Sequence, residues 1–158
     1  MSRKMRIGAL AIGLLLGFGV LILAKVMLLE PEASLLTARF GDVSLKLDLA
    51  TTTVARERGL GGRTDVPEGY GMLFVFSKEG SYGFWMKDTL VPLDIFWLDS
   101  QGHVVSMAQR VEPASYPDVF YPTEPVRYVL ETRAGFAAAH GVATGTPLLL
   151  KNFPTVSE

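Results

Sequence analysis

A run of uncharged residues near the N-terminus divides the chain into two unequal parts. Residues 7–24 contain no Asp, Glu, Lys or Arg, and residues 26–29 continue the apolar character beyond Lys25. A run of this length is close to the minimum that crosses a bilayer as a helix. We therefore expect residues 1–30 to be a membrane anchor or signal segment, and residues 31–158 to form one domain.

The charges beside this run predict its orientation. Basic residues precede it within the first six positions, whereas Glu30 and Glu32 follow it. Because basic residues favour the cytoplasmic side, we expect residues 7–29 to cross the cytoplasmic membrane once, with the N-terminus inside and the domain on the periplasmic side. The alternative is a secreted protein released by cleavage of a signal peptide, although no clean cleavage site follows the run.

The composition of residues 31–158 excludes several classes of function. This part contains 11 Lys and Arg against 15 Asp and Glu, so its formal charge is near −4. A nucleic-acid partner would call for a basic face, so we expect none. The chain has no Cys and only two His residues, which lie far apart in the sequence. We therefore expect no disulfide, no metal site and no cofactor, and a fold that depends on its apolar core.

Short segments with alternating or continuous apolar residues predict a mainly β domain. The expected strands cover residues 36–40, 43–49, 71–76, 84–87, 93–98, 103–111, 126–131 and 147–150. Turn signals separate two adjacent pairs, at Gly41-Asp42 and at residues 99–102, and predict two hairpins. Short helices are expected at residues 54–58 and 134–140, each followed by a glycine. Many short strands with two short helices are typical of a compact β sandwich or barrel.

The stretch at residues 84–94, Phe-Trp-Met-Lys-Asp-Thr-Leu-Val-Pro-Leu-Asp, concentrates aromatic and charged side chains. In an extended chain, Phe84 and Met86 would face one way, and Trp85 and Lys87 the other. Such a pattern indicates one buried face and one face available to solvent or a ligand.

Asp94, at the end of this stretch, falls on the same strand face as two apolar residues. A carboxylate on an apolar face needs a partner, because burying it unpaired is costly. We therefore expect a buried, structural Asp94 that accepts hydrogen bonds from backbone N–H groups or pairs with a cation such as Lys87. Asp88 and Glu131 are interpreted in the same way, as structural polar residues.

Several motifs are spread over most of the domain. They are Glu57-Arg58-Gly59-Leu60 with Arg63, Gly-Met-Leu-Phe-Val-Phe at 71–76, Phe-Trp-Met-Lys-Asp-Thr at 84–89, Val-Pro-Leu-Asp-Ile at 91–95, and Tyr-Val-Leu-Glu at 128–131 followed by Gly135 and Gly145. Over residues 47–150 they resemble the DUF192 family, a domain of unknown function that is widespread in bacteria and archaea. The resemblance implies a compact, mainly β domain, often behind a signal peptide or anchor, and it implies no particular reaction.

Two cations could form a binding site in such a domain. Arg63 follows the glycine turn after the first expected helix, and Lys87 follows the aromatic segment expected beside residues 71–76. Consecutive strands are usually neighbours, so these two loop ends could meet on one rim. We predict a shallow site floored by Trp85 and edged by Arg63, Lys87 and Thr89, which prefers an acidic or sugar-like group. The simpler alternative is that these charges form ion pairs that only order the surrounding turns. We expect no catalytic residues, because neither a nucleophile elbow nor a phosphate-binding glycine loop occurs.

Three functions stay open at this point. The preferred one is a membrane-tethered, extracytoplasmic, non-enzymatic binding module with an unknown ligand. The second is a structural or assembly partner in the cell envelope that uses the Pro-rich aromatic loop at residues 112–125 as its contact surface. The third is an enzyme acting on an envelope polymer. A pocket containing Trp85, Lys87 and Arg63 together would favour the first, and two carboxyl groups facing across a cleft, one with a raised pKa, would favour the third.

Overall fold

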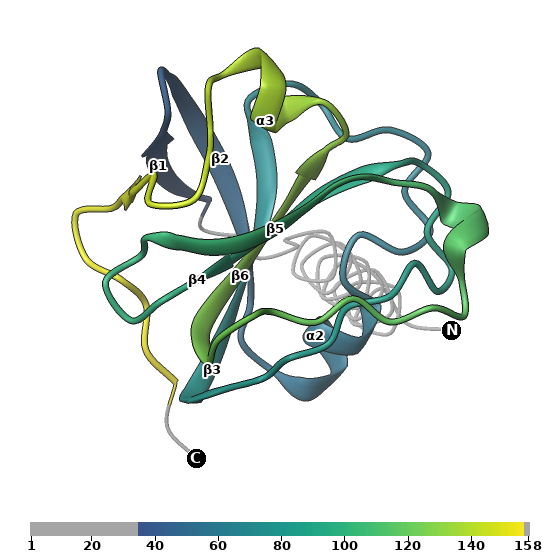
Figure 1. Cartoon of the computed structure of the whole chain (residues 1–158), viewed down its shortest axis with the longest axis horizontal. Coiled ribbons are helices and arrows are strands. Elements are labelled where there is room, and N and C mark those ends of the chain that lie inside the picture. Colours follow the sequence, from purple (N-terminus) through teal and green to yellow (C-terminus); the bar gives the residue numbers. More distant parts are fainter. Residues whose placement is uncertain (1–34, 157–158) are drawn as a thin grey trace, which may run out of the picture. The chain divides into compact units, whose positions relative to one another are not determined.

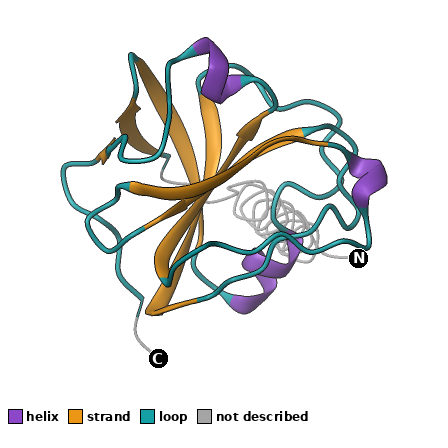
Figure 2. Cartoon of the chain, in the orientation of Figure 1, coloured by secondary structure: helices purple, strands orange, loops and turns teal. Residues whose placement is uncertain are grey.

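The computed structural model describes residues 35–156, which form one curled, seven-stranded sheet with short helices (Figure 1, Figure 2). The strands are β1 (Leu36–Phe40), β2 (Val43–Ala50), β3 (Tyr70–Gly80), β4 (Leu93–Leu98), β5 (Val104–Val111), β6 (Val126–Arg133) and β7 (Leu148–Leu149). The helices are α2 (Thr53–Arg58) and α3 (Phe136–Ala139), with a 3₁₀ helix η1 at Pro113–Ser115.

The expected membrane anchor at residues 7–29 lies outside the described residues. Within residues 35–156, no helix has both the length and the apolar character that a bilayer crossing requires.

The strands follow the order β5-β4-β6-β3-β2-β1-β7, and only the β2–β3 pair is parallel. The domain is therefore mainly β, as expected, but it is a single sheet curled into a half-barrel and not a two-sheet sandwich or a closed barrel. A bridge between His103 and Pro147 brings the β4–β5 turn close to β7. This contact draws the two ends of the sheet toward each other without closing it.

The two predicted hairpins are confirmed. Gly41 has a φ of 64° in the turn that joins β1 to β2, a conformation that glycine adopts without steric cost. In the turn between β4 and β5, the side chain of Asp99 accepts hydrogen bonds from the backbone N–H groups of Gln101 (2.8 Å) and His103 (2.9 Å). Local sequence therefore determines both turns.

Each face of the sheet carries its own apolar cluster. Phe96 and Leu98 of β4 belong to the first cluster, together with Phe136 of α3. Ile95 and Trp97 of the same strand belong to the second cluster, which also contains Leu60, just after α2. The predicted alternation along β4 is confirmed, and both of its faces are buried because it lies inside the sheet. Figure 1 shows α2 and α3 at opposite ends of the molecule in this view.

Two predicted elements differ from the structure. Residues 84–87 form no strand: Phe84 makes a single bridge to Phe120, and Lys87 already belongs to the following turn. The ladder does not continue, because the chain turns at Asp88, whose φ is 55°. The expected helix at residues 134–140 is confined to Phe136–Ala139, because Gly135 before it has a left-handed φ of 87°.

Candidate functional site

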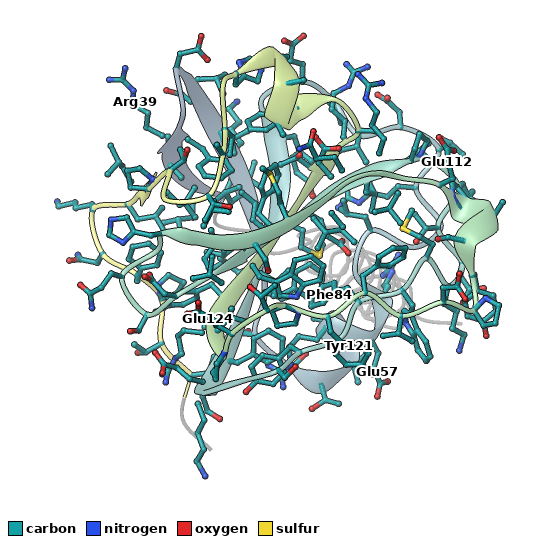
Figure 3. The ribbon with its side chains drawn as sticks, in the orientation of Figure 1. Arg39, Glu57, Phe84, Glu112, Tyr121 and Glu124 are labelled. Carbon is teal, nitrogen blue, oxygen red and sulfur yellow. The ribbon has the colours of Figure 1, made fainter. Side chains whose placement is uncertain are left out.

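A pocket with a volume of about 470 Å³ opens beside α2. We call it the α2 pocket. Its walls come from five parts of the chain that are distant in sequence. They are α2 with the two residues after it, the middle of β3, the irregular segment 81–89, residues Val119 and Tyr121 of the Pro-rich loop, and Glu131 of β6. Figure 3 shows Phe84, Tyr121 and Glu57, three of the lining residues, in the same region of the molecule.

Aromatic rings form the inner wall of the pocket. Phe76 and Tyr82 stack with centroids 3.5 Å apart and planes 8° apart, and the guanidinium of Arg56 lies 5.3 Å from the Phe76 ring centroid. Phe74 and Phe84 meet edge to face with centroids 4.7 Å apart. Such pairs hold their rings in fixed orientations. The wall is therefore rigid and apolar, as ligand pockets usually are.

The outer rim carries exposed aromatic and cationic side chains. Trp85 is 46% exposed, and the Lys87 Nζ atom lies 5.9 Å from the centroid of its ring. The ring of Tyr116, also about half exposed, contacts Trp85 at a centroid distance of 6.1 Å. Arg58 is exposed at the end of α2 and lines the same pocket. An anion entering the pocket would therefore meet two cations at its mouth.

The Pro-rich loop closes one side of the pocket. Phe84 and Phe120 exchange two backbone hydrogen bonds of 2.8 Å each, which fix this loop against the segment 81–89. A Cβ atom on Gly83 would lie 2.6 Å from Tyr121 Cε1 and 2.7 Å from Val119 Cγ1. Because residue 83 has no side chain, Val119 and Tyr121 can pack against the backbone of the segment 81–89.

A tight turn holds Lys87 and Thr89 in position. Asp88 has a φ of 55°, a region that Asp adopts more readily than most residues. The Thr89 N–H donates to the Met86 carbonyl at 3.2 Å, and the Gly62 N–H donates to the Asp88 carbonyl at 2.8 Å. The backbone carbonyl of Asp88, and not its side chain, therefore connects this turn to the glycine turn after α2.

Glu131 lies at the inner end of the pocket and is buried, with 5% of its surface exposed. Its neighbours across the sheet are Met72 on β3 and Ile95 on β4. Within the described part of the chain, its Oε2 atom has no hydrogen-bond partner. Burial raises the pKa of Glu131 to about 8, while the backbone amide of Leu60 acts in the opposite direction. Near neutral pH, Glu131 is therefore mostly a neutral acid that can donate a hydrogen bond.

Arg63 lies outside the α2 pocket. Its guanidinium forms an ion pair with Asp48 at 2.8 Å and lies 4.9 Å from the centroid of the Tyr70 ring. Tyr70 donates a short hydrogen bond to the same carboxylate. Burial is the main cause of the raised pKa of Tyr70, and this hydrogen bond adds to it. Arg63 thus has a structural partner that the sequence pattern did not identify, on β2.

Asp94 is fully buried on the opposite face of the sheet, next to α3. It accepts hydrogen bonds from three backbone N–H groups, those of Arg110 (2.7 Å), Gly135 (3.1 Å) and Ala137 (2.9 Å). Its partners are therefore backbone amides and not Lys87. The carboxylate joins β5 to the start of α3, which accounts for a charge at this buried position.

The structure thus brings three of the four predicted ligand-binding residues together, namely Trp85, Lys87 and Thr89, and leaves Arg63 elsewhere. It adds Glu131, which was interpreted as purely structural. The signal used for Asp94 is absent here, because Glu131 shares its strand face with Arg127 as well as Val129. Among residues 35–156, no group of three His, Asp or Glu side chains is arranged to hold a metal ion.

Comparison with known proteins agrees with this architecture. A crystal structure of a candidate transcription regulator from Sinorhizobium meliloti 1021 has a TM-score of 0.70 and 31% sequence identity, over 75% of this chain and 95% of that one. A protein of unknown function from Novosphingobium aromaticivorans DSM 12444 has a TM-score of 0.69 and 26% identity, over 75% and 89% of the two chains. No curated protein matched the chain.

A family model matches almost the whole described domain. The model is that of DUF192, described as "Uncharacterized ACR", and it covers residues 36–150. This range includes every wall of the α2 pocket. The chain belongs to the DUF192 family.

Proposed function

We propose that this protein is a binding module, held at the periplasmic face of the cytoplasmic membrane by residues 7–29, which takes a small acidic, sugar-like ligand into the α2 pocket. The observation that carries the proposal is the composition of that pocket, with aromatic rings inside and cations at the mouth. Flat rings such as Trp85 offer a surface for the apolar face of a sugar, and Arg or Lys can pair with a carboxylate.

The charge of the domain narrows the choice of ligand. Residues 31–158 carry a formal charge near −4, so a long polyanion would be repelled outside the pocket mouth. Among the exposed charged groups of the pocket, Lys87 and Arg58 outnumber the carboxylate of Glu57, so a ligand with one or two negative charges meets a net positive charge there. The similar Sinorhizobium protein is named as a candidate transcription regulator. Because the domain of this chain is negatively charged, we do not propose that it binds DNA.

The contacts of the Pro-rich loop favour a role in the α2 pocket over a role as a contact surface for an assembly partner. Val119 and Tyr121 line the pocket, and Phe120 pairs with Phe84. A loop held in this way contributes to a site on its own chain. Its exposed Tyr116 also contacts Trp85, at the same rim.

The test is a titration of the full-length chain, purified in mild detergent, with glucuronate, glucose and inorganic phosphate. Glucuronate differs from glucose by the carboxylate, and phosphate supplies an anion without a sugar. We expect heat of binding with glucuronate alone, lost in Lys87→Ala and retained in Lys151→Ala, an exposed lysine outside the pocket. Equal binding of glucose and glucuronate, or equal effects of the two substitutions, would refute the proposal.

The membrane tether is tested separately. A reporter enzyme that folds only outside the cytoplasm, fused after residue 158, should be active in intact cells. Activity only in a cytoplasmic reporter fused at the same place would contradict the expected topology. A mature N-terminus near residue 25 would indicate a secreted protein instead of an anchored one.

One observation also favours an enzyme, as a second candidate. Glu57 and Glu131 both line the α2 pocket, and burial gives Glu131 a pKa of about 8. Hydrolysis of a glycosidic bond uses a neutral carboxylic acid and an ionised carboxylate on either side of the bond. Release of nitrophenol from a 4-nitrophenyl glucuronide, abolished by Glu131→Gln, would support this candidate. Binding of glucuronate without any such release would support the binding module.

A further inference from the structure

The starting observation is the unsatisfied Oε2 atom of Glu131. A buried polar atom is nearly always hydrogen-bonded, so an unpaired one in a native structure calls for an explanation. Here the atom belongs to a residue that is only 5% exposed and lines the α2 pocket, while the described residues give it no partner. A ligand group that enters the pocket is the natural partner for such an atom.

Gly59 packs closely against this atom. A Cβ atom on residue 59 would lie 3.4 Å from Glu131 Oε2 and 3.3 Å from Phe74 Cζ. The φ of Gly59 is 50°, which L-amino acids seldom adopt. A side chain at this position would therefore crowd the carboxyl group and the Phe74 ring, at the point where α2 ends.

The surroundings decide which form of the carboxyl group is present. Phe74 on β3 and Leu60 after α2 are both buried, so water does not solvate a charge there. The charged or titratable groups that line the pocket with Glu131 are Arg56, Glu57, Arg58, Tyr82, Lys87 and Tyr121. Arg56 is bound to the Thr51 and Val75 carbonyls at 2.8 and 3.0 Å, and Arg58 and Lys87 are exposed. No salt bridge within residues 35–156 reaches Glu131.

We propose that Glu131 contacts the ligand directly, as a neutral hydrogen-bond donor at the inner end of the α2 pocket, and so selects ligands that present an uncharged oxygen acceptor there. The ligand then enters with its hydroxyl or ring oxygen inward and its carboxylate toward Lys87 at the mouth. This inference rests on the proposed function, because it assigns an orientation to the same ligand.

The orientation has a direct consequence for pH dependence. When Glu131 loses its proton, the donor disappears and a negative charge replaces it. The carboxyl group then repels both the oxygen acceptor and the acidic ligand as a whole. Affinity for glucuronate should therefore stay constant from about pH 6 to pH 7.5 and fall about tenfold per pH unit above the pKa of about 8.

The experiment compares the full-length wild-type chain with Glu131→Gln. Glutamine keeps the shape and an N–H donor but cannot titrate. The dissociation constant for glucuronate is measured from pH 6 to pH 9 for both proteins, and for Glu131→Met, which keeps the volume but has no donor. We expect a steep loss of affinity for the wild type above pH 8, a flat profile for Glu131→Gln, and at least tenfold weaker binding at every pH for Glu131→Met.

The outcomes separate this inference from the proposed function. Identical pH profiles for wild type and Glu131→Gln, with glucuronate still bound, would overturn the inference and leave the binding function standing. Absence of glucuronate binding by the wild type would overturn both. A ligand-free measurement gives an independent check, because the carboxyl carbon of Glu131, followed by ¹³C NMR, should titrate near pH 8. Titration near 4.5 would show that it is no neutral donor.

Discussion

Gly83 and Tyr121 lie so close that a Cβ atom on residue 83 would be 2.6 Å from Tyr121 Cε1. Real Cβ atoms do not make contacts this short, so Gly83→Ala must displace the side chains of Tyr121 and Val119, which line the pocket. We expect a loss of about 1–3 kcal/mol in the free energy of unfolding, as overpacking usually costs. Urea denaturation of the variant and the wild type measures it.

The cause of that loss can be isolated with a second substitution. If the collision involves the Tyr121 ring, Tyr121→Ala should relieve part of it. The effects of Gly83→Ala and Tyr121→Ala would then combine to less than their sum in a double-mutant cycle. Additive effects would mean that the contact between these two residues does not limit the substitution.

Asp94 should be among the most sensitive polar residues of the domain. Asp94→Ala leaves three N–H groups without this acceptor, that of Ala137 in a buried position and those of Arg110 and Gly135 in partly buried ones. We expect a loss of roughly 2–5 kcal/mol in the free energy of unfolding. The control is Asp118→Ala, an exposed carboxylate in the Pro-rich loop, for which we expect less than about 0.5 kcal/mol. Equal thermal melts for the two variants would contradict this account of Asp94.

The raised pKa of Glu131 predicts how stability depends on pH. Between its ordinary value of 4.5 and about 8, the native state holds one more proton on this residue than the unfolded state does. Stability must then decrease as pH rises through this window, by about 1.4 kcal/mol per pH unit. In Glu131→Gln this contribution is absent. The difference in unfolding free energy, wild type minus variant, should fall by about 3 kcal/mol between pH 5.5 and 7.5.

Because other groups titrate equally in both proteins, that difference reports on Glu131 alone. A difference that stays constant over the same range would show that Glu131 has the same pKa in the folded and unfolded states.

Arg63 and Lys87 should respond in opposite ways to the same substitution. Arg63 is paired with Asp48, has 39% of its side chain exposed, and lies outside the α2 pocket. Arg63→Ala should therefore lower the free energy of unfolding by no more than about 1 kcal/mol and leave glucuronate affinity unchanged. Lys87→Ala should weaken binding and hardly affect stability. Loss of binding in Arg63→Ala would restore the originally predicted shared site.

The local parts of the fold were predictable from sequence, because each depends on a few adjacent residues. Gly41 and Gly102 predict the turns of the two hairpins. The apolar residues at successive positions of β4 predict that both of its faces are buried. At residues 84–87 the alternation correctly predicted which side chains are buried. It did not distinguish an extended segment with one bridge from a paired strand, because period-two burial needs no hydrogen-bond ladder.

The parts that failed depend on long-range pairing. The sequence pattern could not show that β6 lies between β3 and β4, and so could not place Glu131 beside α2. It also could not show that Asp48 on β2 forms an ion pair with Arg63. Both relationships require the strand order, which no short motif encodes. Of the four residues proposed for one site, Trp85, Lys87 and Thr89 line the same pocket and Arg63 does not, and the buried Glu131 was not expected there.

The most direct test of the account uses the two tryptophans of the chain. The Trp85 ring is 46% exposed at the pocket mouth, whereas Trp97 is 1% exposed and its indole N–H donates to the Tyr82 carbonyl at 2.9 Å. Each gives one indole signal in a ¹⁵N–¹H spectrum of the full-length chain, so the exposed and the buried tryptophan can be compared within one titration. If the α2 pocket binds an acidic sugar, glucuronate will shift the Trp85 signal in a saturable way, more than that of Trp97, and Lys87→Ala will weaken the effect. A Trp85 signal that stays in place throughout the glucuronate titration would contradict the account.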